Sequence, residues 1–235
     1  MTGSGANAFV ERILGIEPGL AAFDCDGTLW TIDCGFGFFE WELGRGLVAP
    51  AIEAWARGRY DAYLAGTVDE ETICGEMVTM HRGIDEATLE AAAGEYFRGH
   101  VVQHAFSDML RLVERLLARD TQVWLVSASN EWVIRAGMKQ FGIAADRILA
   151  AKIDSENGII TDRMVRTPSG PGKAQALCEV AQKQIDAAFG NSRWDAEMLA
   201  LAEQAFAINP NPDLEAMARE RGWTIYFPEG RSARL

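Results

Sequence analysis

Two carboxylates, Asp24 and Asp26, stand two residues apart directly after the apolar segment 19–23. Like charges this close destabilise each other unless a cation or a shared proton lies between them. Gly27 permits a tight turn, and Thr28 offers a hydroxyl beside backbone N–H groups that can meet an anion. The segment therefore predicts acid–base or nucleophilic chemistry on an anionic group. The alternative is a surface loop that carries two solvated acids.

Polar residues also accompany later apolar segments. Ser127 follows segment 121–126, and Asp195 comes shortly after segment 185–189. Lys173 opens a helical pattern after a loop rich in Gly and Pro. Because ligands of parallel sheets bind beyond the carboxyl ends of the strands, we expect these side chains to meet the two carboxylates. Each of them alone is more often a loop hydroxyl or a solvated surface charge.

The order of these motifs resembles that of the haloacid dehalogenase superfamily of phosphohydrolases, and the resemblance covers nearly the whole chain. The motifs that carry it are D-C-D-G-T at 24–28, S-A-S at 127–129, Lys173, and G-N-S-R-W-D at 190–195. A helical insertion after the first strand and the ending I-N-P-N-P-D-L at 208–214 are similar to the phosphoserine-phosphatase-like branch.

This resemblance implies that Asp24 is the nucleophile that forms an aspartyl-phosphate. Asp26 would protonate the leaving oxygen and later activate water. The implied cofactor is Mg²⁺, and the implied metal ligands are Asp24, Asp26 (through its backbone carbonyl), Asn191 and Asp195. The implied phosphate-binding residues are Thr28, Ser127, Ala128 and Lys173.

One position departs from the family pattern, because Asn191 stands where the metal motif commonly begins with Asp. An amide oxygen can bind Mg²⁺ but brings no negative charge. We therefore expect weaker metal affinity, with Asp195 acting directly or through water.

Two acidic residues are possible substrate selectors. Asp33 is placed to meet a substrate amine, and an ungapped register puts Glu76 near the position where phosphoserine enzymes carry an Arg. A substrate carboxylate would then be repelled, so a neutral or cationic alcohol phosphate is favoured over phosphoserine. The aromatic residues Phe38, Phe39 and Trp41 are expected to form core, with binding of a quaternary ammonium ester as the alternative.

Strand and helix patterns alternate along most of the chain. Apolar strand patterns cover 19–24, 121–126, 185–189, 205–208 and 223–227, and helical patterns cover 106–118, 131–141, 174–182, 196–203 and 214–221. This alternation predicts an α/β fold with a doubly wound, mainly parallel sheet. Residues 33–100 show only helical patterns, so we expect a helical cap there and a Rossmann-like core formed by 1–32 and 101–235. Asn157-Gly158 is a hairpin turn signal.

The composition excludes several classes of function. The 22 basic residues against 34 acidic ones give a net charge of −12, which argues against nucleic-acid binding. No apolar run is long enough to span a membrane, and the N-terminus has no signal-peptide pattern. The four Cys form no CxxC pair, so we expect reduced thiols and a cytoplasmic location. The oligomeric state stays open.

The function expected from these observations is Mg²⁺-dependent hydrolysis of a small soluble phosphate ester. Phosphoserine itself remains an open question at this point. The alternatives are a non-catalytic phosphate-binding or regulatory domain and a phosphotransferase of the same fold. A dehalogenase is disfavoured, because that chemistry needs neither the second acid Asp26 nor a metal.

Overall fold

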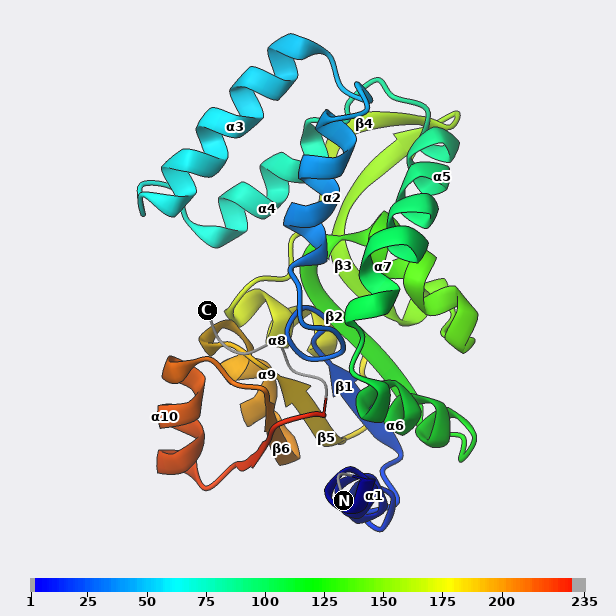
Figure 1. Cartoon of the computed structure of the whole chain (residues 1–235), viewed down its shortest axis with the longest axis vertical. Coiled ribbons are helices and arrows are strands. Elements are labelled where there is room, and N and C mark those ends of the chain that lie inside the picture. The colour runs from blue at the N-terminus through cyan, green and yellow to red at the C-terminus, as the bar shows by residue number, and fades with distance from the viewer. Residues whose placement is uncertain (1–2, 230–235) are drawn as a thin grey trace.

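Seven strands form one sheet at the centre of the protein, and the computed structural model describes residues 3–229. The strand order is β4-β3-β2-β1-β5-β6-β7. Neighbouring strands are parallel except β4, which runs antiparallel to β3. The strands are β1 (Leu20–Phe23), β2 (Gln122–Asn130), β3 (Ile148–Glu156), β4 (Ile159–Arg166), β5 (Ile185–Gly190), β6 (Ala202–Ile208) and β7 (Thr224–Tyr226). The doubly wound, mainly parallel sheet predicted from the sequence is confirmed (Figure 1).

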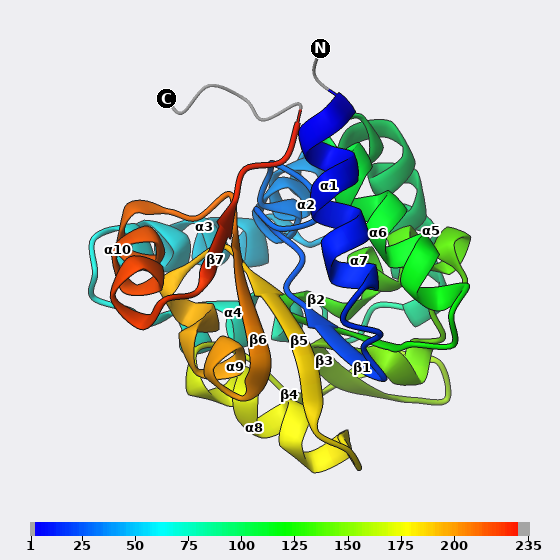
Figure 2. The ribbon, with the colours of Figure 1, turned by 90° about the horizontal axis from the view of Figure 1, so that it is seen from below.

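The two faces of the sheet are covered by different helices, because successive strand residues point to opposite sides. Phe23 of β1 belongs to the hydrophobic cluster of one face, and Ala22 belongs to that of the other. The helices of the first face are α1 (Gly3–Leu14), α6 (Ser107–Leu117) and α7 (Glu131–Met138), and those of the second are α8 (Pro171–Val180), α9 (Ala196–Ala200) and α10 (Pro212–Arg221) (Figure 2). The central strands are therefore buried on both sides, and their polar residues emerge at the strand ends.

Four α-helices, followed by one turn of π-helix (Phe97–Val101) and one of 3-10 helix (Val102–His104), lie between β1 and α6, where the sequence predicted helices without strands. They are α2 (Cys34–Leu43), α3 (Pro50–Leu64), α4 (Glu70–Thr79) and α5 (Glu86–Tyr96). Asp33, Asp69 and Asp85 are the N-caps of α2, α4 and α5, and each side chain accepts a hydrogen bond from a backbone N–H three residues later. Helix α3 instead has Pro50 at its first position, where a missing N–H costs nothing.

The hairpin of β3 and β4 extends toward these four helices (Figure 1). Its turn, Asn157-Gly158, has positive φ angles of 54° and 80°, as the two-residue turn signal predicts. The N–H of Gly83 donates to the carbonyl of Ile160 at 2.8 Å, and the N–H of Ile160 donates to the carbonyl of Ile84 at 3.0 Å. These backbone bonds join a hairpin of the predicted core to the segment predicted as the cap. The division of the chain into a core (1–32 and 101–235) and a cap (33–100) therefore stays a prediction.

Two elements differ from the sequence prediction. The helix predicted at 196–203 ends at Ala200, because Ala202 already pairs with Ile185 and extends the parallel ladder of β5 and β6. Helix α1 was not predicted, although its Phe9 and Ile13 are buried against the sheet.

Within residues 3–229, no helix combines the length and apolar character needed to cross a membrane. All four cysteines are free.

Candidate active site

Asp24 lies at the carboxyl end of β1 and is 4% exposed. Its backbone N–H donates to the carbonyl of Phe189 at 2.9 Å, so the pairing of β1 with β5 fixes its position. Its Oδ2 accepts a hydrogen bond of 2.8 Å from the hydroxyl of Thr28. Between them Gly27 turns the chain with a φ of +76°, a conformation that L side chains rarely adopt. The turn therefore holds the Asp24 carboxylate in one orientation.

Lys173 brings a buried positive charge to this carboxylate. It lies in the first turn of α8, and its Nζ donates to Oδ1 of Asp24 at 2.7 Å and to Oδ1 of Asp195 at 2.6 Å. Burial alone would lower the pKa of Lys173, but the charges of Asp195 and Asp24 outweigh it and raise that pKa. Lys173 is therefore a permanent cation held between two carboxylates.

Asp195 organises the loop that follows β5. Its Oδ2 accepts hydrogen bonds from the backbone N–H groups of Asn191 at 3.0 Å and Ser192 at 2.9 Å, and from the Ser192 hydroxyl at 3.2 Å. A Cβ at Gly190 would lie 2.5 Å from the Cβ of Asp195, so only glycine allows this approach. Because its other oxygen binds Lys173, both oxygens of Asp195 are occupied by protein donors.

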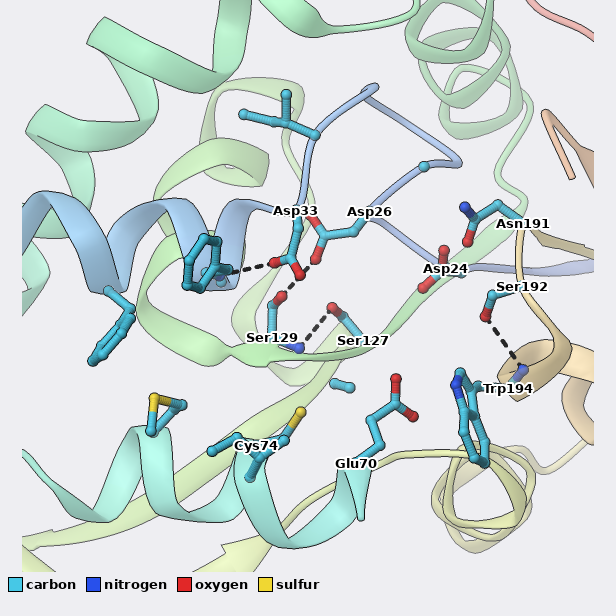
Figure 3. Close-up of a pocket in the computed structure, with 18 of the residues that line it drawn as sticks. Asp24, Asp26, Asp33, Glu70, Cys74, Ser127, Ser129, Asn191, Ser192 and Trp194 are labelled. Atoms are coloured by element: carbon cyan, nitrogen blue, oxygen red, sulfur yellow. Dashed lines mark hydrogen bonds between the residues drawn. The ribbon is translucent and has the colours of Figure 1, made fainter. Parts of the chain in front are cut away.

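Asn191 lies against the turn that carries the catalytic candidates. A Cβ at Gly27 would lie 1.9 Å from Nδ2 of Asn191, so the missing side chain of Gly27 is what lets the carboxamide approach. The carboxamide lies beside Asp24 at the edge of the cavity (Figure 3). An oxygen donor is therefore available next to the buried carboxylate.

The charges of this centre fit a divalent cation. The ammonium of Lys173 contacts Asp24 and Asp195, and Asp26 lines the same cavity, so the carboxyl groups of this centre outnumber its ammonium three to one. Burial and the charge of Asp195 raise the pKa of Asp24 to about 7, against the lowering effect of Lys173. Across residues 3–229 no three His, Cys, Asp or Glu side chains are grouped as a metal site. The amide oxygen of Asn191 and a backbone carbonyl would therefore complete an all-oxygen donor set, which suits Mg²⁺.

Asp26 is held by hydrogen bonds at both carboxylate oxygens. Oδ1 accepts from Nε1 of Trp30 at 2.6 Å and from the backbone N–H of Cys34 at 2.8 Å. Oδ2 accepts from the hydroxyl of Ser129 at 2.5 Å. A Cβ at Gly35 would lie 2.5 Å from that hydroxyl, so Gly35 makes room for it. The sequence prediction missed Ser129, although it lies two residues after Ser127 in the same motif.

Ser127 and Ala128 line the cavity in the last part of β2, beside β1. The hydroxyl oxygen of Ser127 accepts a hydrogen bond from the backbone N–H of Ser129 at 3.1 Å, and the side chain is buried. The structure therefore brings these residues together with Asp24, Asp26, Lys173 and Asn191, as the order of the motifs predicts.

The cavity above these groups has a volume of about 380 Å³. The first insertion helices cover it, with Phe36 and Phe39 from α2 and Tyr60 and Tyr63 from α3. The rings of Phe36 and Tyr60 stack with centroids 4.2 Å apart. Phe38 is buried in the core as expected, whereas Phe39 both packs in a hydrophobic cluster and lines the cavity.

One face of α4 completes the wall. Glu70, Ile73, Cys74 and Met77 recur at helical spacing and line the cavity. The Glu70 carboxylate points inward and accepts a hydrogen bond from the hydroxyl of Ser169 (Figure 3). Burial raises the pKa of Glu70. The sequence prediction did not place Glu70 in the site, although this helical spacing could have indicated it.

The two predicted selectors have different surroundings. Asp33 lines the cavity, and its Oδ1 accepts a hydrogen bond of 2.8 Å from the backbone N–H of Phe36. Partial desolvation by the surrounding cavity wall and the charge of Asp26 raise the pKa of Asp33 to about 6, while the side chain keeps access to solvent. The carboxylate of Glu76 instead accepts from Nε of Arg59 at 2.7 Å, between α3 and α4. Of the two residues, the structure brings only Asp33 to the described wall of the cavity.

Comparison with family models gives a match over most of the chain. The model of the haloacid dehalogenase-like hydrolases matches residues 21–200. A histidinol-phosphatase of Neisseria meningitidis is 24% identical over 217 residues, which cover 88% of this chain and 97% of that protein. A phosphoserine phosphatase of Mycobacterium tuberculosis is 30% identical over 149 residues, which cover 61% of this chain and 48% of that protein.

Solved structures share the fold. A protein of unknown function from Bordetella pertussis superposes with a TM-score of 0.74 and 24% identity, over 88% of this chain and 96% of that chain. A substrate-bound phosphoserine phosphatase superposes with a TM-score of 0.61 and 17% identity, over 92% of this chain and 94% of that chain.

Proposed function

The chain belongs to the haloacid dehalogenase-like hydrolase family, and from this premise we propose that it is a Mg²⁺-dependent phosphomonoester hydrolase that forms an aspartyl-phosphate on Asp24. The observation that carries the proposal is the contact of Asp24 with Lys173 at the base of a cavity that Asp26, Ser127 and Asn191 also line. The cavity is small, so a small phosphorylated metabolite is the proposed substrate. A cytoplasmic location is part of the proposal.

The proposed reaction has two displacements at phosphorus. In the first, a carboxylate oxygen of Asp24 attacks, the bond from phosphorus to the ester oxygen breaks, and Asp26 gives its proton to the leaving alcohol. In the second, water attacks the aspartyl-phosphate and loses a proton to Asp26, and the bond between phosphorus and Asp24 breaks. The products are an alcohol and inorganic phosphate, and both aspartates return to their initial state.

The hydrogen bonds of Asp26 indicate which of its oxygens transfers the proton. Two N–H groups donate to Oδ1, and an N–H cannot act as an acceptor, so a proton on Oδ1 would displace one of them. The hydroxyl of Ser129 beside Oδ2 can accept as well as donate. The proton is therefore carried on Oδ2, with Ser129 adjusting to either state.

The negative charge of the phosphoryl group is met by this chain's own donors. We assign Lys173, the hydroxyl of Ser127 and the backbone N–H of Ala128 to the phosphoryl oxygens. Thr28, which the sequence also predicted as a phosphate-binding residue, is buried outside the described cavity wall and donates its hydroxyl proton to Asp24, so we assign it to positioning the nucleophile. Lys173 also neutralises part of the charge of Asp24, so the approach of a phosphate dianion to a carboxylate is less unfavourable.

When bound, Mg²⁺ would neutralise part of the negative charge that the nucleophile and the phosphoryl group bring together. The residues that would hold it are Asp24, the backbone carbonyl of Asp26 and the carboxamide of Asn191. Asp195 would act by ordering the loop of Asn191, because both of its oxygens already accept hydrogen bonds.

Hydrolysis of p-nitrophenyl phosphate with Mg²⁺ tests this proposal. We expect turnover by the parent protein and a loss of about a thousandfold or more in Asp24→Asn. Asp146→Asn, an exposed acid far along the chain, is the matched control and should retain full activity. Absence of turnover in the parent across a panel of small phosphate esters would favour a non-catalytic binding domain. Heavy-oxygen water distinguishes the remaining alternative, because only hydrolysis places the label in the released phosphate.

A further inference from the structure

We propose that the substrate is the phosphate ester of an amino alcohol without a carboxylate, and that its ammonium group binds between Asp33 and Glu70. This inference rests on the proposed function, because it concerns the part of the same cavity that faces the alcohol.

The first observation is the sign of the charges that line the cavity beyond the phosphoryl site. Asp33 is the N-cap of α2, and Glu70 is the first residue of α4, so the two carboxylates reach the cavity from different helices (Figure 3). Each keeps one oxygen in a protein hydrogen bond, from the N–H of Phe36 and the hydroxyl of Ser169 respectively. A carboxylate accepts several hydrogen bonds, so both retain acceptor capacity toward the cavity.

The second observation concerns the basic side chains of the cavity wall. Among the described residues that line the cavity, Lys173 is the sole basic side chain. Its ammonium already contacts Asp24 and Asp195, at the phosphoryl end. No second basic side chain of this described wall is therefore available to a substrate carboxylate, whereas the acids Asp33 and Glu70 are available to an ammonium group. The positive charges of Lys173 and Arg193 act on Glu70 and favour its ionised form.

The third observation concerns the aromatic side chains of the cavity wall, and it does not depend on the two acids. Phe36 and Tyr60 stack in the cavity wall, and Tyr63 lies beside Tyr60. Trp194 lines the wall near Glu70 (Figure 3), and the guanidinium of Arg193 lies 4.4 Å from the centre of its ring. Aromatic faces attract cations and provide apolar contact for a carbon chain. This wall together with the two acids favours a cationic alcohol over a polyol, which would gain little from the aromatic surface.

Three small phosphate esters separate the effect of a substrate amine from that of a substrate carboxylate. Ethyl phosphate, ethanolamine phosphate and phosphoserine share the same phosphorylated two-carbon unit, and the second adds an amine while the third adds an amine and a carboxylate. We expect kcat/KM for ethanolamine phosphate to exceed that for ethyl phosphate and for phosphoserine by about tenfold each. Histidinol phosphate, an amino alcohol ester with an additional ring, should belong to the favoured group. Equal values for ethanolamine phosphate and ethyl phosphate, or a higher value for phosphoserine, would overturn the inference.

Variants of Asp33 and Glu70 test whether these two residues bind the substrate amine. Asp33→Asn keeps an acceptor for the N–H of Phe36, and Glu70→Gln keeps an acceptor for Ser169, so both remove charge without removing the local hydrogen bond. In each we expect the ratio of kcat/KM for ethanolamine phosphate to that for ethyl phosphate to fall by about tenfold. The ratio is independent of the fraction of folded enzyme. Glu71→Gln, at an exposed position in the same helical turn, is the control, and its ratio should match that of the parent. An unchanged ratio in both test variants would contradict the proposed ammonium site.

Turnover of p-nitrophenyl phosphate separates the two proposals. If the parent hydrolyses this aryl ester but shows no preference for the amine, the substrate inference fails and the phosphatase proposal stands. If the parent hydrolyses no phosphate ester, the phosphatase proposal itself fails.

Discussion

The hydroxyl of Ser129 donates a hydrogen bond of 2.5 Å to Oδ2 of Asp26. Two further donors hold the other oxygen of that carboxylate, so Ser129 contacts the oxygen that we propose transfers the proton. A side chain two residues beyond Ser127 thus contacts the proposed acid–base group from a neighbouring strand.

Ser129→Ala should lower kcat more than it changes KM, by about tenfold for an alkyl phosphate, because Ser129 positions the acid and does not hold the phosphoryl group. The loss should be smaller for p-nitrophenyl phosphate, since nitrophenolate leaves without full protonation. Steady-state kinetics on both esters checks this. Ser155→Ala, in the β3–β4 hairpin, is the control. Equal losses on both esters would rule out a role through Asp26.

Asn191→Asp should strengthen Mg²⁺ binding, because it adds a negative charge to an oxygen donor that already lies beside Asp24. The half-saturating Mg²⁺ concentration for hydrolysis should fall severalfold. The rise in melting temperature on adding Mg²⁺ should also be larger than in the parent, and this readout does not depend on turnover. An unchanged or higher half-saturation would contradict the assignment of Asn191.

Lys173→Met should destabilise the fold by about 3–5 kcal/mol, because it leaves the buried carboxylates of Asp24 and Asp195 without a cation. Denaturant unfolding measures the loss, and the exposed Lys183→Met serves as the control. Adding Asp195→Asn to Lys173→Met should restore part of the stability, since it removes one uncompensated charge and keeps an acceptor for the loop N–H groups. Strictly additive losses would show that the charges do not interact.

His81 and Glu42 form a buried pair in the helical segment, with Nε2 and Oε2 2.8 Å apart. His81→Leu should therefore destabilise the protein by about 3–5 kcal/mol, because Glu42 then stays buried without a partner. Burial raises the pKa of Glu42, so the folded state binds a proton more tightly than the unfolded state. The deficit of the variant should shrink as the pH falls from neutral toward 4.5, the ordinary value for this carboxyl. A deficit that grows on acidification would refute this account.

The strand ends were the part of the site that could be predicted from sequence. Asp24, Ser127 and Asn191 each follow or close an apolar run, and parallel strands bring such ends to one edge of the sheet. The order of the motifs along the chain also indicated that Lys173 and Asp195 belong to the site. It did not indicate that the ammonium of Lys173 contacts the carboxylate of Asp195.

Residues on the covering helices were harder to predict, because the rotational phase of a helix decides which side chains face the site. Glu70 and Glu76 are six residues apart in α4. At about 100° per residue, their side chains point about 120° apart around the helix axis, so they do not lie on the same face. The expectation for Glu76 depended on an ungapped alignment with phosphoserine enzymes. Such an alignment does not show which side of α4 faces the cavity. The partner of Glu76, Arg59, lies on another helix, and nothing in the local sequence of α4 indicates that contact.

The measurement that tests the central claim most directly is the site of phosphorylation during turnover. The parent protein, mixed with Mg²⁺ and p-nitrophenyl phosphate and quenched in acid, should carry a phosphoryl group on the peptide that contains Asp24. Digestion and mass spectrometry locate it, and Asp24→Asn should carry none. A parent protein that turns over the ester while its phosphoryl group appears on another residue, or while Asp24→Asn remains fully active, would contradict the account.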